Sequence, residues 1–233
     1  MIVIEPSITL GALVTEHPEL ARELERRGFD YCCGGRASLG EACAALGLPF
    51  DTVAEQLRAA CESAPAPDWA SMAAAELVDH LVATHHRYLW DELPRLGALV
   101  QKVHAAHGSR HPELARVATL YDALRADLEP HLLKEERVLF PMIHDIASAG
   151  HAVDFHCGSL RNPISVMLAE HDRVGELLAE LRDATEQYTV PADGCASYTA
   201  CFAALEDLET DTHLHVHKEN NLLFPMVVAL EAE

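Results

Sequence analysis

The sequence predicts an all-α protein, in which an antiparallel four-helix bundle follows a small helical N-terminal domain. Apolar residues recur at helical spacing over long stretches that contain few prolines, and alternating β-branched runs are nearly absent. A segment of 13 residues, His131–Ile143, returns in similar form at His215–Val227. With 233 residues and 49% hydrophobic content, the chain is long enough for one or two globular domains.

Residues 1–61 make up the predicted N-terminal domain. Gly28 is placed to end a helix that contains Pro18 to Arg27, because glycine readily adopts the left-handed conformation that follows a helix. Thr52 and Glu55 have the spacing of a capping box, which predicts a helix from there to about Cys61. Residues 62–70 are rich in Pro and Ala and are typical of a linker.

Four long amphipathic helices are predicted in the bundle domain, residues 71–233. They cover about 71–102, 112–146, 162–188 and 194–230. Pro112 suits a first helical position, and Asn162 before Pro163 suits a helix start. Pro141 and Pro225 occupy the same place in the two copies of the repeated segment, so both helices should bend there.

The repeated segment has the frame H-x-x-K-E-x-x-x-L-F-P-M, offset by 84 positions. Its His and Glu stand four residues apart and therefore share one helix face: His131 with Glu135, and His215 with Glu219. His86 precedes His131 by 45 residues, and His171 precedes His215 by 44. The unit is a helical hairpin, and two hairpins make a bundle whose core is a usual place for metals.

These six side chains lie on apolar helix faces, where an unpartnered carboxylate is costly. A lone His there would be read as a hydrogen-bonded core residue, but two matched pairs with two further His favour a cation. Imidazole and carboxylate without thiolate suit iron, and to a lesser degree manganese or zinc. The set is too large for one four-coordinate zinc.

A count of coordination positions suggests a fifth His. Two octahedral irons offer about twelve positions, of which four His, two bridging Glu and a bridging oxide or hydroxide leave about two. His107 is the candidate that would leave one position open for a small ligand, and the matching repeat position is not a His. His104 and His111 compete with His107, and His85 competes with its neighbour His86.

The composition excludes several classes of function. A formal net charge of -20 repels phosphate backbones, so we expect no nucleic-acid partner, and residues 38–60 are too poor in basic residues for a DNA-binding helix-turn-helix. No apolar run is long enough to span a membrane, and no signal peptide is recognisable. Seven Cys without regular spacing predict a reducing, cytoplasmic setting.

Cys32 and Cys33 are neighbours and precede Gly34 and Gly35. Adjacent cysteines pair with each other only under strain, so a structural disulfide is not expected. Two interpretations stay open: small buried residues in a turn, or a mobile thiol pair that reaches a metal or a partner. The connection at 144–162, which carries His151, His156 and Cys157, is either a flap over the site or a plain loop.

The motif pair, with His86, His107 and His171, resembles the hemerythrin-like di-iron bundle. Together with the segment FDYCCGG at 29–35, almost the whole chain resembles the iron–sulfur cluster repair di-iron proteins (the RIC, or ScdA/YtfE-type, family). The resemblance implies two iron ions joined by an oxo or hydroxo bridge. The ligands it implies are His86, His107, His131, His171 and His215, with Glu135 and Glu219 as bridges.

The resemblance also implies a function: repair of iron–sulfur clusters damaged by nitric oxide or peroxide, by iron donation to the damaged protein. Two alternatives stay open. One is a hemerythrin-like protein that binds or senses O2 or NO, and the other is an enzyme that reduces NO or peroxide. Whether the protein is a monomer or a homodimer is also open.

Overall fold

The computed structural model describes residues 4–60, 68–149, 153 and 155–231. All regular elements in this part of the chain are helical, which confirms the predicted all-α class. Cys61, His151 and residues 62–67 of the predicted linker lie outside the described residues. No helix in the described ranges is both long enough and apolar enough to cross a lipid bilayer.

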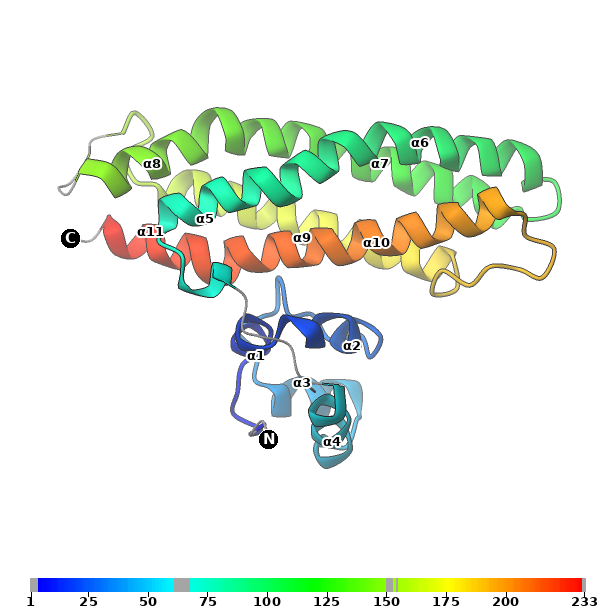
Figure 1. Ribbon diagram of the computed structural model, residues 1–233, viewed down its shortest axis with the longest axis horizontal. Helices are drawn as coiled ribbons and strands as arrows, with labels where there is room; N and C mark the ends of the chain where they lie inside the picture. The colour runs from blue at the N-terminus through cyan, green and yellow to red at the C-terminus, as the bar shows by residue number, and fades with distance from the viewer. Residues whose placement is uncertain (1–3, 61–67, 150–152, 154, 232–233) are drawn as a thin grey trace.

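Four long helical segments lie side by side as an elongated bundle (Figure 1). Three of them contain one wide π-helical turn (η3, η4 and η5). In chain order the segments are α5 (Ala74–Leu81), η3 (Val82–His86) and α6 (Arg87–His107); α7 (Glu113–Lys134), η4 (Glu135–Leu139) and α8 (Phe140–Ala149); α9 (Arg161–Ala184); and α10 (Ala196–Lys218), η5 (Glu219–Leu223) and α11 (Phe224–Leu230). The third helix ends at Ala184, earlier than the expected Tyr188, because Glu186 to Tyr188 adopt left-handed backbone angles.

Two separate apolar clusters fill the bundle. One contains Leu93, Tyr121 and Leu205, and the other contains Leu81, Phe140 and Phe224. Except for His107, the predicted ligand positions lie where each segment passes from one of these clusters to the other. A polar layer therefore crosses the bundle core and is closed by hydrophobic packing on both sides.

The π-helical turns of the second and fourth segments begin at Glu135 and Glu219, the same position in the two repeats. The backbone N–H of Phe140 reaches the carbonyl of Glu135, and Phe224 reaches Glu219 in the same way, five residues back. Pro follows each Phe; it has no N–H, and in a regular helix its ring would press on the carbonyl four residues before it. The predicted bend therefore takes the form of a widened turn in both helices.

The N-terminal module consists of α1 (Leu10–Glu16), η1 (Pro18–Leu20), α2 (Ala21–Glu25), α3 (Leu39–Leu46) and α4 (Phe50–Ala60). Gly28 follows α2 with a φ of +76°, as predicted. The predicted capping box at Thr52 and Glu55 is wrong: α4 begins at Phe50, so Thr52 lies inside its first turn. The capping box of this module is at Ser38 and Glu41, where it opens α3.

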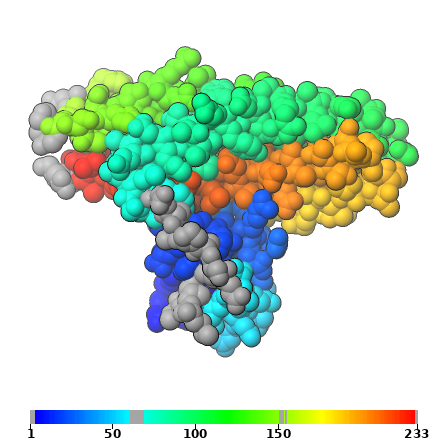
Figure 2. Space-filling model, in the orientation of Figure 1, coloured from blue at the N-terminus to red at the C-terminus, as the bar shows by residue number. Residues whose placement is uncertain are grey.

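The module packs beneath the bundle against α10 (Figures 1 and 2). Val216 of α10 belongs to the apolar core of the module. The Tyr31 ring meets the His217 ring edge-on at 5.7 Å between centroids, and Tyr31 donates a hydrogen bond to Glu25 at 2.8 Å. Glu25 also lies 2.9 Å from Nδ1 of His213 on α10. Apolar packing and buried polar contacts together join the two parts.

Candidate metal centre

Four His and two Glu project into the polar layer of the bundle: His86, His131, Glu135, His171, His215 and Glu219. Each is at most 1% exposed. Their ligand atoms form two groups, in each of which all atoms lie within 4.8 Å of one another. His86 and His215 belong to one group, His131 and His171 to the other, and Glu135 and Glu219 belong to both.

Each carboxylate faces one imidazole of both groups. Glu219 directs Oε1 to Nε2 of His215 and Oε2 to Nε2 of His171, both at 3.1 Å. Glu135 Oε2 lies 3.4 Å from Nε2 of His131 and 3.5 Å from Nε2 of His86. All four Nε2 atoms therefore point to the two carboxylates, with Glu135 and Glu219 between the groups.

Several of these buried atoms have no hydrogen-bond partner: Nε2 of His86, both oxygens of Glu135, and Oε2 of Glu219. Oε2 of Glu135 is 3.4 Å from His131 and 3.5 Å from His86, and these contacts are too long or too poorly aligned for hydrogen bonds. A buried polar atom without a partner is costly, and a native protein keeps one only for a reason. Bound cations would supply the missing partners, so the donor set fits a metal.

The electrostatics also favour a cation. Burial alone would raise the pKa of Glu219, but the charges of His215 and His171 and the hydrogen bond with His215 hold it well below its usual range. Burial alone would lower the pKa of His171, but the charge of Glu219 beside it raises it to about 9. Burial would likewise lower the pKa of His86, but Glu135 outweighs this effect and the pKa is raised. In the protein without metal, protons on His86 and His171 thus balance carboxylates that a cation would otherwise balance.

An outer layer of side chains orients the ligands. Nδ1 of His86 lies 2.9 Å from Glu136, which also accepts a hydrogen bond from Trp90 at 2.7 Å. Nδ1 of His171 lies 2.7 Å from Oδ1 of Asn220. Glu136 and Asn220 follow the bridging Glu in the two repeats, so they perform the same task in the two halves. A partner at Nδ1 fixes the ring and leaves Nε2 free to bind.

The two other imidazoles differ from each other. Nδ1 of His131 lies 2.9 Å from Glu170, which also pairs with Lys134. Nδ1 of His215 has no partner, and the ring of His85 stacks on it at 5.4 Å with an angle of 4°. His85 precedes His86 as Glu170 precedes His171, so the halves diverge here. The competitor His85 therefore lies outside the ligand groups.

Lys218 contacts His85, and Lys134, at the same position of the other repeat, pairs with Glu170. Its Nζ lies 2.7 Å from Nε2 of His85, and the residue is only 5% exposed. Burial lowers the pKa of Lys218 to about 8. Lys134 is half exposed by contrast, so the same motif position is buried in one repeat and solvated in the other.

His107 is not in this layer, and its predicted role as a ligand is corrected here. It ends α6, 21 residues after His86, and at 1.5 Å per residue this separates the two by roughly 31 Å. There its Nε2 lies 3.2 Å from Sγ of Cys195, and its ring packs edge-on against Tyr198. The competitor His104 lies in the same last turn of α6, 18 residues after His86, which by the same measure is roughly 27 Å away.

A cavity of about 770 Å³ reaches the layer from the side of the first hairpin. His86, Trp90, Glu136 and Phe140 are among its lining residues. Among the ligands of the bundle, His86 is the one that this cavity approaches.

Cys32 and Cys33 lie on the opposite side, where the N-terminal module meets α10 and η5. Cys32 is 6% exposed and Cys33 is half-buried. The backbone carbonyl of Cys32 accepts hydrogen bonds from Nδ2 of Asn220 at 3.4 Å and of Asn221 at 3.1 Å. Asn220 thus touches the cysteine turn with one side-chain atom and His171 with another. Cys157, in the connection before α9, contacts the backbone of Ser159.

Sequence reasoning missed the outer-layer residues Glu136, Glu170 and Asn220. A signal was present, because each is adjacent in sequence to a ligand. Two of them also share one repeat position.

Comparisons with known proteins cover both parts of the chain. Residues 77–227 match the Hemerythrin HHE cation binding domain, and residues 7–61 match a domain of unknown function, DUF542. The chain is 34% identical over 225 residues to the iron-sulfur cluster repair protein YtfE of Enterobacter sp. (strain 638), with 95% of this chain and 97% of that protein covered. The proteins of the same name from Escherichia coli O81 (strain ED1a) and Escherichia fergusonii are each 33% identical over 223 residues, with the same coverage.

Proposed function

The chain belongs to the hemerythrin HHE family of cation-binding proteins, in the two-part form of the iron–sulfur cluster repair proteins, and from this premise we propose that it repairs damaged clusters with iron held in its bundle. The observation that carries the proposal is the set of buried Nε2 and Oε atoms that lack partners. A site built this way binds a cation, and its complete burial keeps that cation from solvent until it is needed.

We assign one iron ion to His86 and His215 and a second to His131 and His171, with Glu135 and Glu219 shared between them. Bound ferrous iron would supply both the material for rebuilding a cluster and a redox-active position for NO or O2. Without His107 as a ligand, two octahedral irons with these ligands and a bridging oxide or hydroxide keep about two open coordination positions instead of one. Glu136, Glu170 and Asn220 would hold three of the four imidazoles in the ligating orientation.

The setting of the proposed function is the cytoplasm under nitrosative or oxidative stress, and the partner is a damaged iron–sulfur protein. The surplus of acidic residues on the chain fits a protein partner better than a nucleic acid.

The test uses the full-length protein loaded with Fe(II) and an iron–sulfur enzyme inactivated by nitric oxide. We expect the enzyme to regain activity while the bundle loses iron. Metal analysis of the separated proteins and Mössbauer spectra measure this loss. Glu219→Gln removes a shared carboxylate charge and should abolish iron loading and repair. Glu180→Gln is the matched control, because Glu180 pairs with Arg116 on the surface of α9.

Two outcomes oppose iron donation. In one, the loaded protein leaves the enzyme inactive while free iron restores it. In the other, the enzyme recovers and the bundle keeps all of its iron.

The cavity beside His86 supports a second candidate function, the binding or reduction of NO or O2 at the same centre. A stable O2 adduct of the reduced protein would indicate a gas binder or sensor. Nitrous oxide in the headspace during turnover would indicate a reductase. Iron retained in the bundle through either experiment would favour this candidate over donation.

A further inference from the structure

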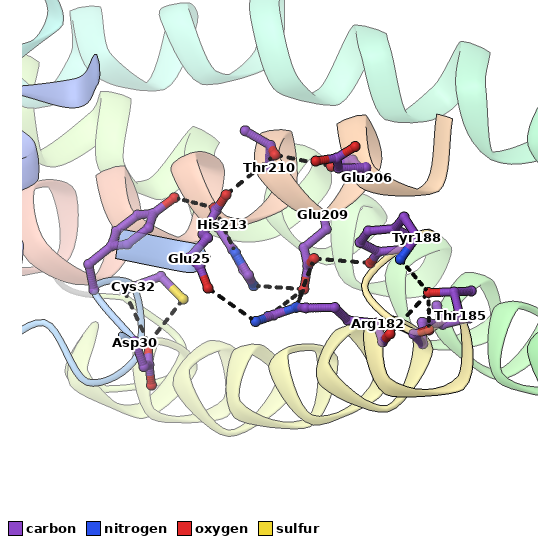
Figure 3. Close-up of polar contacts among 12 residues, drawn as sticks. Glu25, Asp30, Cys32, Arg182, Thr185, Tyr188, Glu206, Glu209, Thr210 and His213 are labelled. Carbon is purple, nitrogen blue, oxygen red and sulfur yellow. Dashed lines mark hydrogen bonds and ion pairs between the residues drawn. The ribbon is translucent and has the colours of Figure 1, made fainter. Parts of the chain in front are cut away.

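Asp30, Cys32 and Cys33 bring three potential metal ligands together outside the bundle. Their ligand atoms lie within 4.8 Å of one another in the turn between α2 and α3. Sγ of Cys32 lies 3.9 Å from Sγ of Cys33 and 3.3 Å from Oδ1 of Asp30. Figure 3 shows Asp30 directly beside the thiol of Cys32, facing α9.

These distances match those of one tetrahedral ion. Metal–sulfur bonds of about 2.3 Å at tetrahedral angles place two sulfurs roughly 3.8 Å apart. An oxygen ligand at about 2.0 Å stands roughly 3.5 Å from each sulfur in the same geometry. The separation of the two sulfurs is far too long for a disulfide, whose S–S bond is about 2.0 Å.

The backbone holds the ligands in this arrangement. Oδ1 of Asp30 accepts hydrogen bonds from the N–H groups of Cys32 at 3.1 Å and Cys33 at 2.9 Å. The carboxylate is therefore oriented before any ion binds. The pKa of the Cys32 thiol is raised by its contact with Cys33, by burial and by Asp30. A bound cation would offset the part of this shift that comes from repulsion between the thiolate and carboxylate charges.

The surroundings leave the turn accessible and negatively charged. A cavity of about 390 Å³ reaches Asp30, Cys32 and Cys33, and Asp172 and Glu176 of α9 also line it. Its one Arg, Arg182, is already paired with Glu209. Glu176 is paired with Arg173 at 3.1 Å, so the negative charge of the cavity comes mainly from Asp30 and Asp172, which attract a cation rather than an anion.

We propose that Asp30, Cys32 and Cys33 form a second metal site, which binds one thiophilic divalent ion and serves as a transit point for iron between the bundle and the damaged protein. The transit role rests on the proposed function; the site itself does not. Each thiol releases a proton to solvent as its metal–sulfur bond forms. With three protein ligands, one tetrahedral position stays open for a ligand from the partner.

The site is close to the bundle centre. A methyl group at Gly175 would lie 3.9 Å from Sγ of Cys33, and Gly175 follows His171 by one helical turn of about 5.4 Å. The Cys32 carbonyl is linked to His171 through Asn220. The two thiols and His171 are therefore neighbours in space.

The test titrates Cd²⁺ into the reduced, iron-loaded full-length protein, in which the bundle is already filled. Cadmium–thiolate charge-transfer absorption reports binding, and metal analysis gives the stoichiometry. We expect one Cd²⁺ per chain, lost in Cys32→Ser and in Cys33→Ser. Asp30→Asn keeps an acceptor for the two N–H groups but removes the charge, and should weaken binding on the order of 10-fold.

Cys43→Ser is the matched control, since it removes another thiol of the same module that lies buried in its core. It should bind Cd²⁺ like the wild type. Unchanged binding in Cys32→Ser or Asp30→Asn overturns the proposal. So does a disulfide between the two cysteines under the reducing conditions, which thiol titration would detect as two missing thiols.

Failure here and failure of the proposed function are distinguishable. If Cd²⁺ does not bind but the loaded protein still restores the damaged enzyme, the transit site is wrong and repair stands. If Cd²⁺ binds as expected and no enzyme is restored, the site stands and the repair function is wrong.

Discussion

Asn220 offers the sharpest test of how the chain holds its metal. Its Oδ1 lies 2.7 Å from Nδ1 of His171, and its Nδ2 reaches the Cys32 carbonyl at 3.4 Å. Loss of an outer-layer partner of a metal-ligating His costs about 10–100-fold in affinity, which is about 1.4–2.8 kcal/mol. Asn220→Ala should therefore release iron to a ferrous chelator about 10–100-fold more readily than the wild type.

Two companion variants make the result specific. Asn221→Ala removes hydrogen bonds to the backbone carbonyls of Tyr31 and Cys32 at 3.3 and 3.1 Å and a contact with His217 at 3.2 Å, but no contact with a ligand of the bundle centre. It should loosen the N-terminal module and leave iron affinity unchanged. Asn220→Asp restores an acceptor and adds the charge that Glu136 carries in the first repeat, so it should hold iron at least as tightly as the wild type.

The measurements are the rate of iron transfer to the chelator and the iron content after dialysis, both at fixed pH. The reasoning is refuted if Asn220→Ala keeps its iron like the wild type. It is also refuted if Asn221→Ala loses iron as readily as Asn220→Ala, because the effect would then come from docking of the module and not from His171.

Three further predictions concern the packing that surrounds the centre. A Cβ on Gly35 would come within 2.5 Å of the Tyr31 carbonyl and of Oδ1 of Asn221. Gly35→Ala should therefore lower the free energy of unfolding by about 1–3 kcal/mol and make the module more susceptible to limited proteolysis. An unchanged cleavage rate would contradict this. Arg182→Ala leaves Glu209 buried without its bidentate partner (Figure 3). Urea unfolding should show a free energy of unfolding lower by about 3–5 kcal/mol. A loss below about 1 kcal/mol would show that solvent replaces the pair. Leu124→Ala empties a fully buried position of the bundle and should cost about 2–5 kcal/mol with iron content unchanged; loss of iron at unchanged stability would contradict the separation of the two layers.

Helix positions were predictable because a period of 3.6 residues persists through long amphipathic segments. The repeat then added what periodicity cannot supply, namely which helices face each other. The nearly equal offsets between His86 and His131 (45 residues) and between His171 and His215 (44 residues) imply two equivalent hairpins. The error at Thr52 has a local cause: the carbonyl of Pro49 already accepts the first helical hydrogen bond, so Thr52 lies in the first turn and Glu55 in the second.

His107 shows why a coordination count is weaker than a repeat. After 21 residues a helix has made nearly six full turns, so His107 returns close to the face of His86 and satisfies the face criterion. The same helix carries it roughly 31 Å along the axis, which no side chain can span. The repeat does not determine how far along the helix His107 lies. Because of that distance His107 packs against Cys195 and Tyr198 and is not a ligand of the centre.

The asymmetry that His107 was expected to provide lies instead outside the ligand groups. Three positions differ in residue between the halves: Glu170 against His85, Glu136 against Asn220, and Arg137 against Asn221. At a fourth position the residue is the same, but Lys218 is buried and Lys134 is half exposed. The two asparagines bind the carbonyls of the cysteine turn, which a carboxylate cannot do because it has no hydrogen to donate.

The asparagines of the second repeat thereby hold the N-terminal module beside that repeat. The corresponding side of the first repeat keeps Glu136 and Trp90 at an open cavity. The ligand set is nearly symmetric, but its two sides differ. One side borders a cavity that small molecules can enter, and the cysteine turn of the N-terminal module covers the other.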